Sequence, residues 1–384
     1  MSDQLFIEPL DVLYLRGNRL FGDPGDHAEA LMPPWPSVFA GALRSRMLAD
    51  DHDTDFADFA EGKKPPTGQL KDCIGTPTTP GSFRISRLSL ARKSETGTVL
   101  PFLPLPADLV SKNEKTDYLF PRNLHAALAS SVNMPMLPIL AQEKTEKPDT
   151  GRWLDDEGLA AYLAGRPIGS NHLVKQETLW REDPRLGIAL DASTRTAEEG
   201  RIYTTSTVAM AKAIGFLVGV EGAGQCLPQC GLLRLGGDGR GALIQHCNSV
   251  WPIPPWQRIE QERRFRMVLL TPGIFPDGWK PPGLMEKNDR LLIHGNGFVA
   301  RLVAAAVKRP YVVSGWDLAR NAPKPAQKAV PSGSVYWFDS LEGKIEDLQQ
   351  LEKSGLWHLT VNPDPIRKAE GFNHILIAAW PQNP

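Results

Sequence analysis

The stretch LFIEPLDVLYLRGNRLFGDPG at residues 5–25, followed by MPPWPSVFAGALRSRM at 32–47, decides the fold. Its apolar run predicts a strand, its glycines predict a long polar loop, and apolar residues then recur at helical spacing after Ser37, the expected N-cap. The order strand, glycine-rich loop, helix is typical of both ferredoxin-like and nucleotide-binding units. The loop carries Arg16 and Arg19 but no Gly-Lys-Ser, which favours gripping a nucleic-acid backbone over NTP hydrolysis.

Composition places the chain among globular proteins and gives little information about its ligand. It has 384 residues, of which 41% are hydrophobic and 23% are charged, and this length predicts two or three domains. With 43 basic and 44 acidic residues, the formal net charge of −1 gives no support to nucleic-acid binding. The sequence shows no membrane-spanning apolar run, no signal-peptide pattern and only four cysteines, which predicts a reducing, cytoplasmic setting.

Proline and glycine divide the rest of the chain, with 34 residues of each. The stiff segment WPIPPW at 251–256 predicts a boundary between an N-terminal domain, 1–250, and a C-terminal domain, 257–384. Residues from about 111–207 are polar and uneven in pattern, which predicts an insertion with some helix in the first domain. The insertion ends in a predicted hairpin whose polar tip is 192–200.

Strand and helix signals continue along both parts of the chain. Further strands are predicted at 82–93, 213–220, 265–270, 311–315, 333–339 and 374–380, and helices at 123–131, 156–163, 298–308 and 341–353. The apolar alternation slips near Arg87, which predicts a bulge. The order of elements in the C-terminal part again suits a ferredoxin-like half, so the predicted fold class is α+β.

Three glycine-rich loops follow predicted strands and have basic residues nearby: 16–25, 236–241 and 331–334. Glycine lets a backbone approach a phosphate closely, and its free N–H groups attract an anion, although one such loop alone is usually an ordinary turn. The last loop follows the basic stretch 301–328 and precedes Tyr336, whose ring can stack on bases. The residues predicted to bind RNA are Arg16, Arg19, Arg84, Gly236, Gly237, Gly239, Arg240, Lys324, Lys328, Ser332, Gly333, Ser334 and Tyr336.

The segment GNGFVA at 295–300 fits a dinucleotide-binding fingerprint, with Asp317 at a suitable distance beyond it. However, the chain before it lacks the strand–helix alternation of a doubly wound sheet, and too few residues follow for a full dinucleotide fold. We therefore predict no cofactor, and an oxidoreductase stays open as a remote alternative.

Two further groups of residues have a metal or catalytic interpretation. Cys226, Cys230, His246 and Cys247 have a spacing that zinc permits, but adjacent residues of a strand point to opposite faces, so buried free cysteines are predicted. His27 is a candidate general base for RNA cleavage, without an identifiable partner. We predict no metal and no catalytic residue, with an RNA-cleaving endoribonuclease as the alternative; under the resemblance described next, this alternative would be a crRNA-processing enzyme.

Six segments carry a resemblance that covers nearly the whole chain. They are IEPLDVLYLRGNRLFG at 7–22, PPWPSVFAGALRS at 33–45, GIALDASTRTAEEGRIYTT at 187–205, LLRLGGDGRGA at 232–242, LLTPGIF at 269–275 and VVSGWDLARNAPKPAQKAVPSGSVYWF at 312–338. Together they resemble subunit three of the Cmr (type III-B) CRISPR effector complex, in the repeat-associated mysterious protein (RAMP) superfamily. The pairing of GGDGR with SGWDL and PSGSVYWF is the most specific part.

This resemblance implies two ferredoxin-like (RRM-type) RAMP domains and a non-catalytic subunit that holds the repeat-derived 5′ tag of the crRNA in antiviral defence. It also implies docking on the large polymerase–cyclase subunit and on the backbone RAMP subunits, an indirect relation to target RNA, and no membrane. Carried onto this chain, the family's glycine-rich loops are 331–336 and 236–241, and its hairpin tip is 192–200. The stretches 50–81 and 111–184 match no motif of the family.

Overall fold

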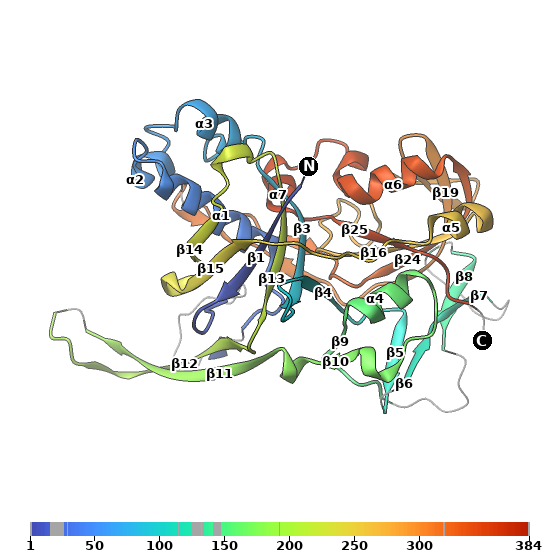
Figure 1. Ribbon diagram of the computed structural model, residues 1–384, viewed down its shortest axis with the longest axis horizontal. Helices are drawn as coiled ribbons and strands as arrows, with labels where there is room; N and C mark the ends of the chain where they lie inside the picture. Colours follow the sequence, from blue (N-terminus) through green and yellow to red (C-terminus); the bar gives the residue numbers. More distant parts are fainter. Residues whose placement is uncertain are drawn as a thin grey trace.

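The structure is a computed structural model of mixed α+β architecture, built from antiparallel sheets and short helices (Figure 1). It describes residues 2–15, 27–28, 30–113, 115–124, 132, 134–140, 147–191, 193–317 and 319–382. At 27–28, 189 and 198–203 the backbone alone is described. Arg16 and Arg19 and the loop around them therefore lie outside the described residues. Within the described ranges, no helix is long and apolar enough to cross a membrane.

The first large sheet holds eight antiparallel strands in the order β10-β9-β4-β3-β13-β1-β15-β14. In chain order they are β1 Asp3–Pro9, β3 Arg84–Lys93, β4 Val99–Pro104, β9 Arg152–Leu154, β10 Leu173–Lys175, β13 Ile214–Glu221, β14 Cys230–Arg234 and β15 Gly241–His246. Of these, β1, β3, β13 and β15 stand side by side in the order second, third, first, fourth. The predicted bulge is confirmed, since the pairing of β13 with β3 shifts at Arg87.

Helix α1, Pro36–Asp50, follows β1 and packs on this sheet through its apolar face. The ring of Phe39 lies 4.9 Å from the ring of Phe216 on β13, measured between centroids. The predicted helix is therefore confirmed, but its N-cap is Trp35 and not Ser37. The helix begins at Pro36, and proline suits the first helical position because the N–H that it lacks would have no partner within the helix. Two shorter helices follow, α2 Phe56–Ala60 and α3 Gly68–Ile74.

The second large sheet holds six antiparallel strands in the order β17-β18-β19-β24-β16-β25. In chain order they are β16 Phe265–Leu269, β17 Leu284–Lys287, β18 Arg290–His294, β19 Phe298–Ala306, β24 Val335–Gly343 and β25 Ile375–Ala378. Without the hairpin of β17 and β18, the strand order is again second, third, first, fourth. The helices of this part are α5 Trp256–Glu262, α6 Ile345–Ser354 and α7 Pro365–Glu370.

The prediction of a helix at 298–308 was wrong, because this segment forms strand β19 between β18 and β24. Its alanines favour a helix, but pairing on both sides overrides that propensity. Leu302, Val303 and Ala304 are consecutive and fully buried, so the run lacks the alternation of a half-exposed strand. The fingerprint-like segment 295–300 thus enters a strand and lacks the helix N-terminus that holds a dinucleotide phosphate.

A long hairpin projects from the body of the molecule (Figure 1). Its strands are β11, Trp180–Leu190, and β12, Ala197–Met210, and β12 also pairs in parallel with β2, His27–Ala28. The predicted hairpin is confirmed, but the tip is shorter than 192–200, because β12 already begins within that range; residue 192 lies outside the described residues. Asp191 closes the turn by accepting hydrogen bonds from backbone N–H groups two and three residues further on.

The predicted insertion forms small strand pairs and a helix. Its elements are β5 Leu109–Lys112, β6 Lys115–Tyr118, β7 Phe120–Asn123, β8 Met136–Ile139 and α4 Asp156–Leu163. Helix α4 matches its predicted bounds, whereas the predicted helix 123–131 lies outside the described residues from 125 on. Two more strand pairs lie before β24: β20 Tyr311–Val313 with β23 Gln327–Ala329, and β21 Trp316–Asp317 with β22 Ala322–Pro323.

A buried polar network joins the second sheet to the segment beside β5. Arg266 on β16 forms an ion pair with Asp108, and both side chains are fully buried. Arg266 also donates hydrogen bonds to the carbonyl oxygens of Ala379 at 2.8 Å and Tyr162 at 2.7 Å. The Tyr162 hydroxyl in turn donates to Asp108 at 2.8 Å. The charge on Arg266 is thus surrounded by oxygen acceptors from three parts of the chain.

His374 joins the two large sheets and predicts a dependence of stability on pH. Its side chain is buried, with Nε2 3.0 Å from the carbonyl oxygen of Ile85 on β3, and burial lowers its pKa from 6.5 to about 4. The folded protein therefore holds His374 neutral where the unfolded chain binds a proton. We expect the free energy of unfolding to fall by about 3 kcal/mol as the pH drops from 6.5 to about 4. Urea titrations should show a flatter pH dependence in His374→Gln, and parallel curves would contradict this.

Candidate nucleic-acid interface

A groove with a cavity volume of 1140 Å³ runs between α1 and the edge of the first sheet. On α1, Ser37, Gly41, Ser45 and Ala49 recur every four residues along the groove and make one shallow helical face. The opposite wall is β14 and the loop that follows it. The glycines of this wall are Gly236, Gly237, Gly239 and Gly241.

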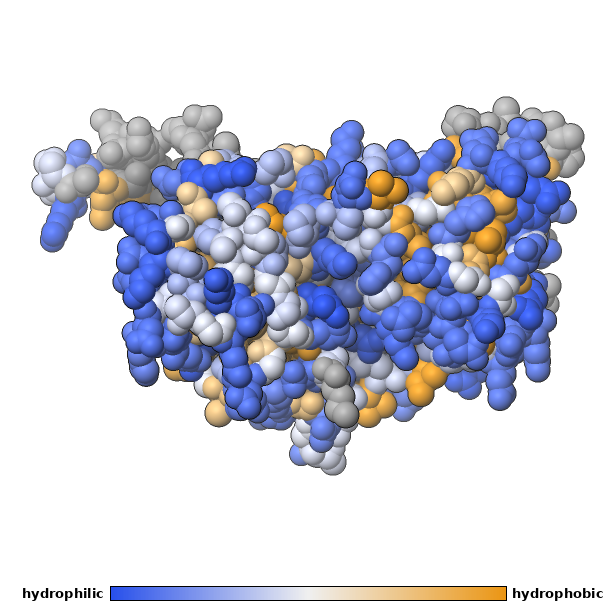
Figure 2. Space-filling model, turned by 90° about the horizontal axis from the view of Figure 1, so that it is seen from above, coloured by the Kyte–Doolittle hydropathy of each residue, from blue (hydrophilic) through white to orange (hydrophobic). Residues whose placement is uncertain are grey.

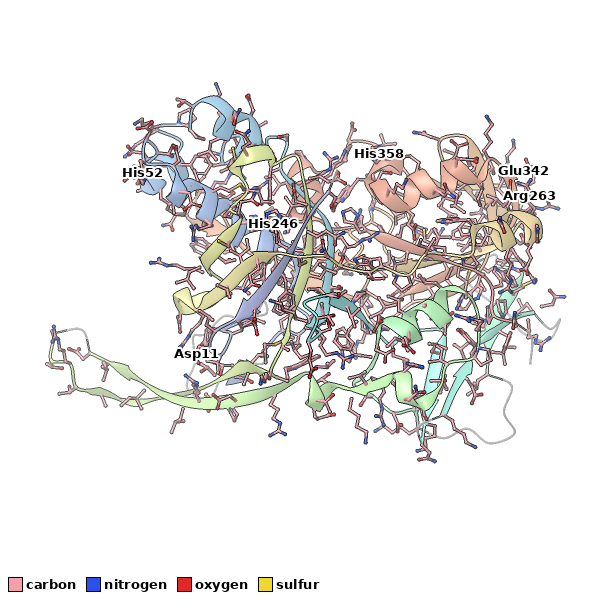
Figure 3. The ribbon with its side chains drawn as sticks, in the orientation of Figure 1. Asp11, His52, His246, Arg263, Glu342 and His358 are labelled. Carbon is pink, nitrogen blue, oxygen red and sulfur yellow. The ribbon has the colours of Figure 1, made fainter. Side chains whose placement is uncertain are left out.

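The glycine-rich loop after β14 is held in place by the backbone of Tyr14. The N–H of Gly237 donates to the Tyr14 carbonyl oxygen at 2.8 Å, and Gly236 has a φ of 78°, where a Cβ would lie 2.7 Å from the same oxygen. Arg240 pairs with Asp11 at 2.9 Å, and Figure 3 shows Asp11 at the lower end of β1. The loop therefore shapes the groove through its lack of side chains, while the Gly237 N–H and the Arg240 side chain have protein partners.

Aromatic and basic side chains stand at the rim of the groove. Trp316 on β21 and Phe56 on α2 line it and are 54% and 44% exposed. Arg46 on α1 pairs with Asp50 at 2.8 Å, and Arg234 on β14 is exposed. These lining residues are absent from the contacts predicted from the sequence. The spacing of small residues along α1 was the signal in the sequence that could have indicated the groove.

In the loop 331–334, predicted to cradle a phosphate, Gly333 and Ser334 are buried, while Pro331 and Ser332 are partly exposed. The N–H of Gly333 donates to the carbonyl oxygen of Leu269, and its own carbonyl oxygen accepts from the N–H of Ala107, both at 2.7 Å. Gly333 has a φ of 79°, and a Cβ there would lie 2.6 Å from Nζ of Lys308. The glycine is therefore explained by a tight turn against neighbouring segments, and its N–H is not free for a phosphate, contrary to the prediction. Contacts of the rest of this loop with RNA stay a prediction.

Most side chains in and after this loop are buried. Ser332 is partly exposed and donates to the carbonyl oxygen of Leu270, just beyond β16, at 2.8 Å, and Ser334 is fully buried. The rings of Tyr336 and Trp337 are fully buried as well, and the Tyr336 hydroxyl donates to the carbonyl oxygen of Trp279 at 2.6 Å. The prediction that Tyr336 stacks on bases was wrong, because β24 is a central strand with both faces covered.

The remaining predicted contacts lie on separate elements. Arg84 on β3 pairs with Glu221 at 2.6 Å, and Lys324 pairs with the buried Glu370 at 2.7 Å. Lys328 on β23 is exposed. None of these three lines the groove, so their contacts with RNA stay predictions from the sequence.

Comparison with known proteins gives the family. The sequence profile of the CRISPR-associated protein family Cas_Cmr3 matches residues 5–380. The chain belongs to this family. The family identified from the six sequence segments is thus confirmed.

Several solved structures are similar to this Cas_Cmr3 family member at low identity. A cryo-EM structure of the type III-B Cmr-beta complex bound to cognate target RNA and AMPPnP contains a chain with 16% identity and a TM-score of 0.46, covering 87% of this chain and 86% of that chain. A chain of the same complex bound to target RNA alone has 15% identity and a TM-score of 0.45, and the match covers 87% of this chain and 86% of that chain. The crystal structure of the Csm3–Csm4 subcomplex of a type III-A interference complex contains a chain with 10% identity and a TM-score of 0.34. That match covers 90% of this chain and 94% of that chain. No curated protein matches the chain.

The cysteines of this Cas_Cmr3 family member lie in different environments. Cys73 is buried and burial raises its pKa to about 12, Cys226 and Cys247 are partly buried, and Cys230 is exposed. The prediction of buried cysteines therefore fails for Cys230, which sits on the edge strand β14. Within the part of the chain that the structure describes, no group of three or more His, Cys, Asp or Glu is arranged to hold a metal.

The histidines are distributed over separate elements. Figure 3 shows His52 beyond α1, His246 at the end of β15 and His358 beside α6. His27 lies in β2, where only the backbone is described. His52, His246 and His358 therefore lie on different elements. Figure 2 shows one face of the molecule, on which apolar groups form separate patches among hydrophilic ones.

Proposed function

We propose that the chain is the third subunit of a type III-B (Cmr) CRISPR effector complex and holds the 5′ tag of the crRNA in the groove beside α1. The observation that carries this proposal is the groove itself, in a member of the Cas_Cmr3 family. Its two walls come from the sequence segments at 33–45 and 232–242, which also carry the family resemblance.

The groove has the features that a single RNA strand with separated bases requires. Exposed rings at the rim, Trp316 and Phe56, offer stacking surfaces, which is how proteins commonly hold unpaired bases. Arg234 places positive charge at the edge, where phosphates would run, and Arg46 lines the groove as well, paired with Asp50. The small residues of α1, such as Gly41, let the strand lie close to the helix.

The wider assignment follows the family. Each large sheet contains four strands in the order second, third, first, fourth, and we propose that each is a ferredoxin-like (RRM-type) half, with the boundary at 251–256. The subunit would dock on the large polymerase–cyclase subunit and on the backbone RAMP subunits and cleave no RNA itself. Purified protein that cleaves repeat RNA specifically would contradict the non-catalytic assignment.

Substitution of Trp316 tests the groove directly. Trp316→Ala should weaken binding of an RNA that begins with the 5′ repeat tag by about 1–3 kcal/mol, because one base loses its stacking surface. Trp316→Phe keeps a ring and should retain most of the affinity. Fluorescence anisotropy with labelled RNA measures both variants. Equal affinity of the alanine variant and the wild type would place the RNA elsewhere.

A further inference from the structure

The ring of Trp316, which lines the groove, is carried by a small lobe of the C-terminal part. This Trp316 lobe, residues 311–317 and 319–329, consists of the strand pairs β20–β23 and β21–β22. Its base is anchored, because Val313 and Ala329 are buried in one apolar cluster. Its outer end is open to solvent, since Trp316 is 54% exposed. The place of the ring in the groove therefore depends on what holds the lobe between its base and its outer end.

Helix α7 makes those contacts through two charged side chains. Nζ of Lys324 donates to Oε1 of Glu370 at 2.7 Å, and Arg367 donates to Oε2 of the same carboxylate at 2.9 Å. Arg367 also donates to the side-chain oxygen of Gln327 at 2.7 Å and to the carbonyl oxygen of Ser314 at 3.2 Å. Both side chains of α7 are buried, so water competes little for these hydrogen bonds.

These contacts reach Trp316 through the backbone of the lobe. The N–H of Lys324 donates to the carbonyl oxygen of Gly315 at 2.8 Å, and the Ser314 hydroxyl donates to the carbonyl oxygen of Lys324 at 2.7 Å. Trp316 follows Gly315 directly and pairs with Pro323, the neighbour of Lys324. Helix α7 thus holds one strand two residues before Trp316 and the other strand beside the residue that pairs with it.

The carboxylate of Glu370 also acts on the helix that forms one wall of the groove. Helix α7 packs against α1 (Figure 1). Burial lowers the pKa of Arg44 on α1, and the negative charge of Glu370 is the largest influence that opposes this. Among the described residues, Nε and Nη2 of Arg44 have no hydrogen-bond acceptor. Glu370 therefore attracts a cation of α1 as well as a cation of the Trp316 lobe, and so relates these two parts of the groove to each other.

We propose that Arg367 and Glu370 are positioning residues, which fix the Trp316 ring in the groove and so determine how tightly RNA is held; this role rests on the groove being the RNA site. A base loses its stacking contact when the ring beneath it moves, so the affinity should fall as the Trp316 lobe becomes more mobile. The sequence predicts a different role for Lys324, a direct contact with a phosphate. The two roles are separable, because a lost phosphate contact lowers the salt slope and a displaced ring does not.

The test uses the full chain with Lys324→Met or Gln327→Leu. Both variants keep the pair of Arg367 and Glu370, so the fold should hold, as circular dichroism checks. We expect each to bind an RNA that begins with the 5′ repeat tag about threefold or more weakly, with an unchanged salt slope. Combined with Trp316→Ala, neither should weaken binding further by more than about twofold, because the ring to be positioned is gone. Without RNA, amide hydrogen exchange in the lobe should be faster than in the wild type.

Lys328→Met is the matched control, because it removes an exposed lysine from the same lobe. Any loss of affinity that it causes should add to the loss in Trp316→Ala. Additive losses in Lys324→Met and Gln327→Leu would overturn the proposal, as would a lower salt slope in the first with full affinity in the second.

Failure of the positioning role and failure of the groove give different results. If Trp316→Ala weakens binding while both variants keep wild-type exchange and affinity, the positioning role is wrong and the groove stands. If exchange in the lobe is faster while Trp316→Ala binds RNA as the wild type does, the groove is not the RNA site, and a role of α7 in RNA binding is excluded with it.

Discussion

Replacing Asp108 by Ala is expected to lower the free energy of unfolding by about 3–5 kcal/mol. The substitution leaves the guanidinium of Arg266 fully buried without a counter-charge; the carbonyl oxygens of Ala379 and Tyr162 and the nearby tyrosine rings are neutral. A buried charge without its counter-charge bears its full desolvation cost, and the Tyr162 hydroxyl loses its acceptor at the same time. Urea unfolding followed by tryptophan fluorescence and circular dichroism measures the change.

Two controls separate the buried charge from a general loss of contacts. The exposed pair of Arg84 and Glu221 has side chains 49% and 32% exposed, so Glu221→Ala should cost less than about 1 kcal/mol. Combining Arg266→Met with Asp108→Leu removes both charges and should recover much of the loss. If Asp108→Ala and Glu221→Ala prove equally mild, the buried network does not stabilise the fold as described.

Filling the groove should abolish tight RNA binding without harming the fold. Nothing lies within 4 Å of the position that a Cβ would take at Gly41, and this glycine lines the groove from the middle of α1. Gly41→Phe places a ring where the RNA is proposed to lie. We expect the affinity for tag-bearing RNA to fall at least about tenfold, equivalent to ~1.4 kcal/mol. The free energy of unfolding should hold or rise, because glycine is a poor helix former.

Gly41→Ala provides the matched control, since it gains helix propensity but adds only a methyl group. It should be at least as stable as the wild type and bind RNA with similar affinity, as measured by anisotropy and by thermal unfolding. Wild-type affinity in the phenylalanine variant, with its fold intact by circular dichroism, would exclude the groove as the RNA site.

Local patterns in the sequence predicted those elements whose formation depends on neighbouring residues. The apolar spacing after Ser37 predicted α1, observed at 36–50, and the continuous apolar run at 213–220 predicted the buried strand β13. Helix α4 was also predicted at its observed bounds, because Asp155 caps it and acids occupy its first turn. The failure at 298–308 has the opposite cause, since pairing with strands on both sides decided the conformation of an alanine-rich segment.

The site depends on contacts that no local pattern reveals. The loop 331–334 has the glycine and nearby bases of a phosphate loop, but Gly333 is buried against Ala107 from a distant segment. The burial of Tyr336 could not be predicted either, because only the order of strands in the sheet shows that β24 is central. Conversely, Trp316 reaches the groove from about 270 residues beyond α1, so only the fold brings it there.

The position of β25 has a consequence for how the chain matures during synthesis. This strand is at most 2% exposed although it forms the edge of its sheet, because α4 lies beyond it and the N–H of Ala379 donates to the carbonyl oxygen of Leu163 at 2.8 Å. Roughly 200 residues separate the two elements, which ribosomes at 5–20 residues per second take about 10–40 seconds to make. Throughout that interval the nascent chain exposes the part of α4 that β25 later covers, a binding surface for chaperones until β25 emerges.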